Sequence, residues 1–298
     1  MNRGHFYAIA AYGLWGLLPI YWQQLSHVPA TQVVAHRIVW SCAVLIPIIW
    51  LSGKSGTVSK AAKQPRVLFR QLIAALLICA NWLGFVWAVT HGRMVESSLG
   101  YFINPLFSVL LAVVLLGERL RGIQWMAISI AAAGIGWLGW QYGTIPWIAI
   151  LLASTFCLYG FVKKTTKLDP VTSLSIETWL LFIPAIAFIA WEQYSGRGGF
   201  LVHGTATDSM LLMSGIATTI PLLCFAAGAQ RISLSTIGLL QYLGPTIQFL
   251  LGWLVYHEPF DNKKLIGFVF VWIALVIYAT ESVIAARRRS LCIIEEPV

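Results

Sequence analysis

The pentapeptide YFINP at residues 101–105 returns as QYLGP at residues 241–245, an offset of 140 positions. The same offset carries Phe85 onto Phe225, and each pair lies at a matching place in a pattern of apolar segments. The match is best over the last three apolar segments of each half and fades near the start of each half. The chain is therefore predicted to consist of two related halves.

The composition indicates that lipid, rather than water, is the main solvent of the surface. Of the 298 residues, 58% are hydrophobic and only 10% are charged, whereas a soluble domain carries roughly a quarter charged residues. The net charge of +9 does not indicate a nucleic-acid partner, because the basic residues are concentrated in short segments between apolar runs. The five cysteines lack paired spacing, so neither a disulfide framework nor a zinc site is indicated.

Ten apolar segments are long enough to cross a hydrocarbon core about 30 Å thick, which needs roughly 20 helical residues. They cover residues 5–24, 31–51, 68–90, 95–116, 122–140, 146–163, 173–193, 208–229, 236–256 and 263–283. Five crossings per half turn the second half upside down, as in many secondary transporters with a site at the membrane midplane. The expected fold is an all-α integral membrane protein of ten transmembrane helices in two inverted five-helix repeats. We expect the repeats at 1–143 and 144–286, and a cytoplasmic tail at 287–298.

The distribution of Lys and Arg predicts that both termini are cytoplasmic, because cytoplasmic loops carry the excess of these residues. With the N-terminus inside, the outer loops hold only four basic residues: Arg93, Arg197, Lys263 and Lys264. The inner segments hold fifteen: Arg3, Lys54, Lys60, Lys63, Arg66, Arg70, Arg119, Arg121, Lys163, Lys164, Lys167, Arg231, Arg287, Arg288 and Arg289.

Ionisable residues inside the apolar segments are candidates for a functional site, because a charge in the bilayer is costly. His36 and Arg37 lie in the second segment and Glu177 in the seventh, and the offset of 140 carries Arg37 onto Glu177. In one interpretation both charges face a polar cavity and hold a charged or zwitterionic substrate. In the other, each anchors its helix near a headgroup region, where long side chains reach toward water.

A second polar group surrounds the turn between the third and fourth segments. Its candidate site residues are Asn81, Trp82, His91, Glu96, Tyr101 and Asn104. Tyr101 and Asn104 are three residues apart and share a helix face, and with Glu96 near the outer mouth they are candidates to line a path. The alternatives are interhelical hydrogen bonds for the two asparagines and a solvated loop for His91 and Glu96.

Two further features are candidates for shaping or gating a cavity. Pro105 and Pro245 occupy matching places in the two halves and are expected to kink their helices, either for gating or as static packing features. Trp15, Trp82 and Trp87 lie deeper than the tryptophans near segment ends, so they are candidates to stack on a substrate.

Catalytic signatures are missing from the sequence. It holds no zinc-protease motif, no nucleophile elbow and no phosphate-binding glycine loop. We therefore expect no enzyme activity, catalytic residue, cofactor or metal, and any active transport would use an ion gradient or the gradient of the substrate.

Several longer motifs resemble a known family. The runs ESSLGYFINPL at 96–106, AHRIVWS at 35–41, TTIPLLCF at 218–225 and QYLGP at 241–245 are similar to the RarD branch of the EamA-domain transporters. These transporters belong to the drug/metabolite transporter superfamily. The similarity extends over nearly the whole chain, although the segment from Tyr256 to Pro259 departs from it.

The resemblance implies an inner-membrane protein that moves small metabolites or drugs, with chloramphenicol among the candidates. Carried over by motif, the matching positions are His36, Arg37, Asn81, Trp82, Glu96, Tyr101, Asn104, Glu177 and Gln241. We expect a secondary transporter that exports or exchanges a small polar or zwitterionic metabolite by alternating access. Arg37 would engage an anionic group, and Glu177 a cationic group or a coupling proton. The alternative is a non-transporting membrane subunit or sensor, and the sequence leaves the oligomeric state open.

Overall fold

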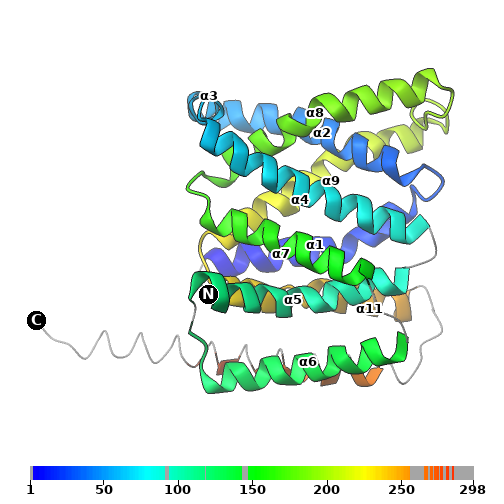
Figure 1. Cartoon of the computed structure of the whole chain (residues 1–298). Coiled ribbons are helices and arrows are strands. Elements are labelled where there is room, and N and C mark those ends of the chain that lie inside the picture. The colour runs from blue at the N-terminus through cyan, green and yellow to red at the C-terminus, as the bar shows by residue number, and fades with distance from the viewer. Residues whose placement is uncertain are drawn as a thin grey trace, which may run out of the picture.

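The computed structural model of the chain describes residues 3–90, 94–117, 119–142 and 147–255, and a discontinuous set between 265 and 284. Over these residues it is helical and contains no strand (Figure 1). Its helices are α1 (Arg3–Gln23), α2 (Ala30–Leu51), α3 (Ser55–Ala62), α4 (Pro65–Thr90), α5 (Met94–Leu116), α6 (Gly122–Tyr142), α7 (Trp147–Thr165), α8 (Pro170–Tyr194), α9 (Thr205–Ala229), α10 (Leu234–Leu240) and α11 (Leu243–Leu254).

The first eight expected segments coincide with α1, α2 and α4 to α9, within a few residues at either end. The ninth is divided into α10 and α11, with a turn at Gln241 and Tyr242. The tenth is described only in part, as an apolar helical stretch at Leu265–Ala274. The sequence did not predict α3, which occupies a stretch expected to be a loop.

Five of the described helical segments are long and apolar enough to cross a membrane. They are Ala30–Leu51, Pro65–Phe85, Trp147–Thr165, Pro170–Tyr194 and Thr205–Ala229. At about 1.5 Å per residue, a helix of this length spans roughly 30 Å, which matches the hydrocarbon core of a bilayer.

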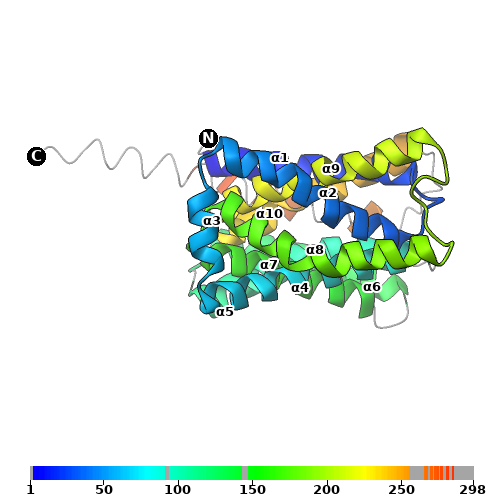
Figure 2. The ribbon, with the colours of Figure 1, turned by 90° about the horizontal axis from the view of Figure 1, so that it is seen from above.

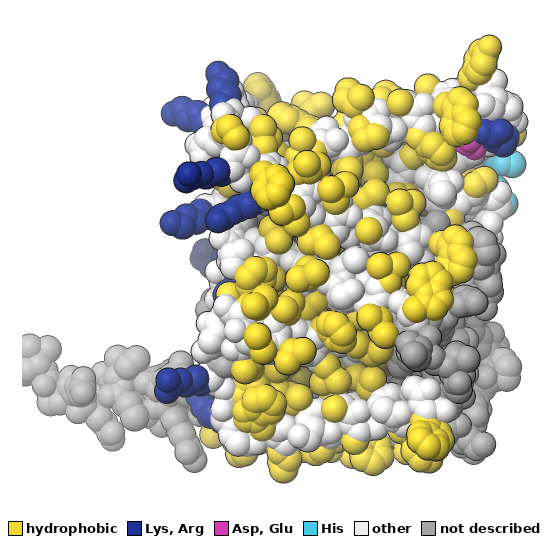
Figure 3. All heavy atoms as spheres, in the orientation of Figure 1, with side chains coloured by type: hydrophobic (Ala, Val, Ile, Leu, Met, Phe, Trp, Pro, Cys, Tyr) yellow, Lys and Arg dark blue, Asp and Glu magenta, His cyan; other side chains and the backbone are white. Residues whose placement is uncertain are grey.

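The long helices lie side by side in one bundle, and α3 crosses its end (Figures 1 and 2). Helix α2 packs between α8 and α9, while α7 packs against α4 and α5. Lys and Arg side chains gather at the end of the bundle where α3 lies, and the flank of the helices is mostly apolar (Figure 3). Basic side chains at one end and apolar side chains along the flank are the pattern expected of a bundle that spans a membrane.

A close contact between α2 and α9 depends on Gly215. A Cβ atom at this position would lie 2.3 Å from the backbone carbonyl carbon of Trp40. Small residues at such crossings let membrane helices approach closely. The contact fixes the distance between two helices that both contribute to the candidate site.

Aromatic side chains from α1, α7 and α9 pack together within the largest core cluster of the described residues. Trp15 packs on Phe156 and Phe225, with ring centroids 5.6 Å apart in both cases. Tyr159 stacks on Phe225 at 5.9 Å. This cluster fixes the Tyr159 ring, which carries its hydroxyl toward a buried acid on α8.

Candidate functional site

A small internal cavity lies between α2, α4, α8 and α9. Its volume is about 20 Å³. Its polar lining residues are Ser41, Glu177, Thr178, Thr218 and Thr219, and its apolar ones are Ile38, Ile78, Trp82, Leu174, Leu181 and Leu222. A space of this size accommodates water, whereas a pocket for a small metabolite needs roughly 300 Å³ or more. This cavity is therefore too small to hold such a metabolite.

Arg37 lies buried beside this cavity, with 8% of its surface exposed. Its Nε donates to Thr218 Oγ1 over 2.9 Å. The guanidinium lies over the rings of Trp22 and Trp82, 4.6 and 4.3 Å from their centroids. It forms no ion pair with any residue that the structure describes. Aromatic faces and one hydroxyl offset only part of the cost of burying a cation, so the guanidinium retains the capacity to pair with an anion.

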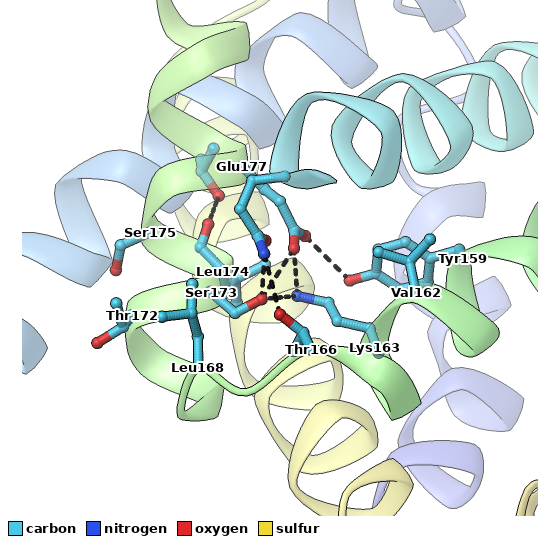
Figure 4. A network of polar contacts seen from close by, with 12 residues as sticks. Tyr159, Val162, Lys163, Thr166, Leu168, Thr172, Ser173, Leu174, Ser175 and Glu177 are labelled. Atoms are coloured by element: carbon cyan, nitrogen blue, oxygen red, sulfur yellow. Dashed lines mark hydrogen bonds and ion pairs between the residues drawn. The ribbon is translucent and has the colours of Figure 1, made fainter. Parts of the chain in front are cut away.

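Glu177 lies on the cavity wall and already has a cationic partner. Lys163 Nζ donates to its Oε1 over 2.5 Å, and both side chains are almost completely buried. Ser173 Oγ donates to the same oxygen over 3.1 Å, and the Tyr159 hydroxyl donates to Oε2 over 3.3 Å. Figure 4 shows Lys163 and Tyr159 reaching from α7 toward this carboxylate on α8.

Gln71 of α4 completes the surroundings of Glu177. In the orientation that satisfies both of its amide atoms, its nitrogen lies 2.6 Å from Glu177 Oε1, and its oxygen accepts from Thr166. The carboxylate thus receives hydrogen bonds from one ammonium group and three neutral groups. These donors stabilise the carboxylate form against the cost of its burial.

Lys163 is a site residue that the sequence interpretation missed. It was counted among the residues of an inner loop, whereas the structure places it in the last turn of α7 with no exposed surface. The signal in the sequence was indirect. Glu177 lies within an apolar segment, a buried acid requires a counter-charge, and Lys163 lies near the end of the preceding segment, on the same side of the membrane as the start of the segment that holds Glu177.

Asp169 fixes the start of α8 next to this pair. Its carboxylate caps the helix by accepting from the backbone N–H groups of Val171 and Thr172. It also pairs with Lys54 over 2.5 Å. Burial acts to raise the pKa of Asp169, but hydrogen bonds from Lys54 and Thr172 and the charge of Lys54 outweigh it and lower the pKa.

Three expected site residues have partners within the protein. Asn81 Nδ2 donates to the backbone oxygen of Leu152 over 2.9 Å and to Thr155 over 3.0 Å, which is an interhelical bond between α4 and α7. His36 accepts from Trp40 Nε1 over 3.2 Å. Trp15 lies in the aromatic cluster of α1, α7 and α9. The geometry gives these side chains roles in packing, and Trp82 alone among the expected tryptophans lines the cavity.

Asn104 and Gln241 differ from these residues, because part of their hydrogen-bonding capacity is unused. Both amide atoms of Asn104 and the Oε1 atom of Gln241 are buried without a partner among the described residues. Tyr101, on the same face of α5 as Asn104, packs on Phe85 with centroids 5.7 Å apart. Unpaired buried polar groups are costly, so these positions are suited to bind water or a polar ligand.

The remaining gating candidates are described unevenly. His91 lies outside the described residues, as do the side chains of Glu96 and Pro105. Pro245 lies in the first turn of α11, directly after the break that separates this helix from α10. Proline is well tolerated there, because a first-turn N–H has no partner within the helix.

Polar contacts join neighbouring elements at both ends of the bundle. At the end away from α3, Gln32 of α2 donates to the backbone oxygen of Arg197 over 2.6 Å and accepts from Gly199 N over 2.7 Å. At the end with α3, Lys54 pairs with Asp169, and Lys164 donates to the backbone oxygen of Ile232 over 2.6 Å. The described residues contain no cluster of three metal-binding side chains.

Comparison with known proteins identifies a transporter family. A family model described as the EamA-like transporter family matches residues 2–140 and, a second time, residues 144–280. An uncharacterized transporter of Vibrio cholerae is 40% identical over 97% of this chain and 96% of its own length. The protein RarD of Escherichia coli is 38% identical over 97% of this chain and 98% of its own length.

The fold also occurs among solved structures. One crystal structure superposes with a TM-score of 0.70 and covers 93% of this chain and 97% of its own, at 17% sequence identity. At this low sequence identity, the similarity between the two structures shows a shared fold and nothing more.

Proposed function

Since the chain belongs to the EamA-like transporter family, we propose that this multi-pass membrane transporter moves a small polar or zwitterionic metabolite or drug by alternating access. Amino-acid-like compounds are the main candidates, and chloramphenicol is a further one. We place it in the inner membrane, with ten spans in two inverted repeats and both termini cytoplasmic. Transport would be secondary, as export or exchange.

The observation that carries this proposal is the state of Arg37. The guanidinium is buried, lies between two indole rings and has no carboxylate partner among the described residues. An arginine held in this way presents a planar set of donors that matches a carboxylate or phosphate. The anionic group of a substrate would therefore form the ion pair that Arg37 lacks.

Glu177 would contact the opposite part of the substrate. Thr218 lines the cavity together with Glu177 and accepts the hydrogen bond from Arg37, so the two charges adjoin the same cavity from different sides. A zwitterion with its anionic group at Arg37 would direct its cationic group toward Glu177. The asymmetry between these two positions supports recognition of a polar molecule with two unlike ends.

Alternating access requires that one end of the bundle opens at a time. We assign closure at the end away from α3 to Gln32, which bonds to Arg197 and Gly199, and closure at the other end to the pair of Lys54 and Asp169. Each set consists of a few polar contacts near helix ends. Such contacts can be exchanged for contacts with water at low cost.

Uptake by proteoliposomes tests this function. Purified protein is reconstituted, and accumulation of radiolabelled amino acids and of chloramphenicol is compared with that of empty liposomes. We expect Arg37→Ala to abolish most of the flux of any transported compound, and Arg37→Lys to restore only part. Arg66→Ala, which removes an exposed arginine at the start of α4, is the matched control and should transport normally.

Two outcomes would contradict the proposal. Equal flux in Arg37→Ala and the wild type would exclude Arg37 as the substrate-binding cation. A failure of every candidate compound to accumulate would favour a sensor or accessory subunit.

A further inference from the structure

We infer that Lys163 is a displaceable counter-ion of Glu177. During the transport cycle the carboxylate releases Lys163 and takes up an external positive charge, either a proton or an ammonium group of the substrate. The inference rests on the proposed function, because it assigns the charge exchange to one pair of residues in the candidate site.

The two members of the pair are placed differently with respect to the cavity. Glu177 lines it, while Lys163 approaches the carboxylate from outside the lining, near the end of α7. An external charge that enters the cavity therefore reaches Glu177 without passing Lys163. The two cations compete for one carboxylate from opposite sides.

The carboxylate does not depend on Lys163 alone. Without it, Glu177 still accepts from Ser173, from Tyr159 and from the amide of Gln71. Three neutral donors hold the acid in place while its cationic partner changes.

Lys163 itself is held by few contacts. Apart from Glu177 it donates to Ser173 over 3.0 Å, and it lies 5.3 Å from the centroid of the Tyr159 ring. It lies two residues before the end of α7, on the strongly basic end of the bundle. Its flexible four-carbon chain allows the ammonium group to move toward water at that end while the helix stays in place.

No other charged side chain described in the structure pairs with Glu177. The groups that face it are Lys163 and Tyr159 from α7, Ser173 from α8, and Gln71 from α4. Arg37, beside the same cavity, is bonded to Thr218. A proton on Glu177 would neutralise the carboxylate and so remove its attraction for Lys163. A substrate ammonium group would instead take the place of Lys163 beside the carboxylate.

Dicyclohexylcarbodiimide tests this exchange without requiring transport, because it modifies carboxyl groups in apolar surroundings in their protonated form. The purified full chain is treated between about pH 8.5 and about pH 5.5, and adducts on Glu177 are quantified by peptide mass spectrometry. We expect slow modification of the wild type at high pH that accelerates strongly as the pH falls. In Lys163→Met, we expect modification about tenfold faster near neutral pH and nearly independent of pH, because a lone buried acid takes up a proton.

Three controls identify the site and the exchanging charge. Glu177→Gln should lose the adduct on this peptide. Lys163→Arg keeps a cation that binds carboxylates through two donors, and it should be modified more slowly than the wild type. Modification that is slower in methylammonium chloride than in sodium chloride at the same pH identifies an ammonium group as the exchanging charge, and dependence on pH alone identifies the proton.

The inference fails if wild-type Glu177 stays unmodified at every pH while Lys163→Met is modified, because the pair would then be permanent. If the Lys163 variants do not fold, the pH series of the wild type decides alone. An unmodified Glu177 in a protein that still transports would refute the exchange and leave the proposed function intact. A modified Glu177 in a protein that transports nothing would support the exchange and refute the function.

Discussion

At the scale of single residues, the candidate site contains two buried charges in different states. Among the described residues, Arg37 interacts with aromatic rings and a hydroxyl, whereas Glu177 interacts with an ammonium group and three neutral donors. The first arrangement leaves a cation available to a ligand. The second satisfies the acid within the protein until another positive charge competes for it.

The Lys163–Glu177 pair makes a prediction about stability. Lys163→Met leaves an unpaired buried acid, and Glu177→Gln leaves an unpaired buried ammonium, so each should destabilise the fold by roughly 3–5 kcal/mol. The double variant removes both charges and should be more stable than the sum of the two single effects indicates. Unfolding of the purified proteins in one detergent measures this difference. Additive losses in the double variant would mean that the two side chains are not coupled.

Asp169 makes a prediction about pH. Because its pKa is lowered in the folded state, its stabilising contribution is present above the ordinary carboxyl pKa and is lost as the pH falls through the folded value. Asp169→Asn keeps a helix-capping side chain but loses the ion pair with Lys54, and it should cost up to about 1 kcal/mol near neutral pH. Thermal unfolding should show that the difference in stability between Asp169→Asn and the wild type disappears at acidic pH. A difference that persists at a pH well below the lowered pKa of Asp169 would contradict this reasoning.

The sequence predicted individual charges better than it predicted their partners. Arg37 and Glu177 could be identified because a charged residue inside a membrane carries a high free-energy cost and is therefore unusual within an apolar segment. It did not identify Lys163, because a lysine near a helix end normally reaches toward water, and only the pairing across the α7–α8 connection keeps it buried. The sequence showed that Asn81 is a polar residue within an apolar segment. It could not show the hydrogen bond to Leu152, because that bond depends on how α4 and α7 pack.

At the scale of elements, the contact between α2 and α9 controls the width of the cavity. Gly215→Ala should separate these helices or block folding, because the added methyl group would overlap the backbone of Trp40. Gly136→Ala in α6 is the matched control, since its Cβ would meet no atom within 4 Å and alanine favours helix. We expect a clearly lower unfolding temperature for the first variant and an unchanged or slightly higher one for the second. Equal stability of the two variants would show that the α2–α9 crossing tolerates a wider spacing.

Most helix positions could be predicted from apolar length alone, because every long helix must match the thickness of a bilayer. The division of the ninth segment into α10 and α11 could not be placed in this way. The repeated proline marked a local weakness, whereas the turn itself falls at Gln241 and Tyr242, a few residues earlier. Helix α3 was missed because eight residues are too few to give a clear periodic signal, and its Val58 and Ala61 are buried by packing against the bundle.

At the scale of the whole molecule, the two ends of the bundle differ in charge, and this predicts the orientation. Single cysteines at Ser55 in α3 and Ser195 after α8 would lie at opposite ends, in a background without the five native cysteines. A maleimide that cannot cross membranes should label Ser195→Cys in intact cells and Ser55→Cys only after permeabilisation. The reverse pattern would place the basic end outside and contradict the expected topology.

The central claim is that Arg37 binds the anionic group of a transported solute. Thermal unfolding of the purified protein against a library of polar metabolites tests it most directly, because a ligand that binds the folded state at 100 times its Kd adds about 2.7 kcal/mol of stability. The account predicts that the stabilising compounds share an anionic group, that Arg37→Ala loses the shift and that Arg66→Ala keeps it. The same shift in Arg37→Ala as in the wild type would contradict it.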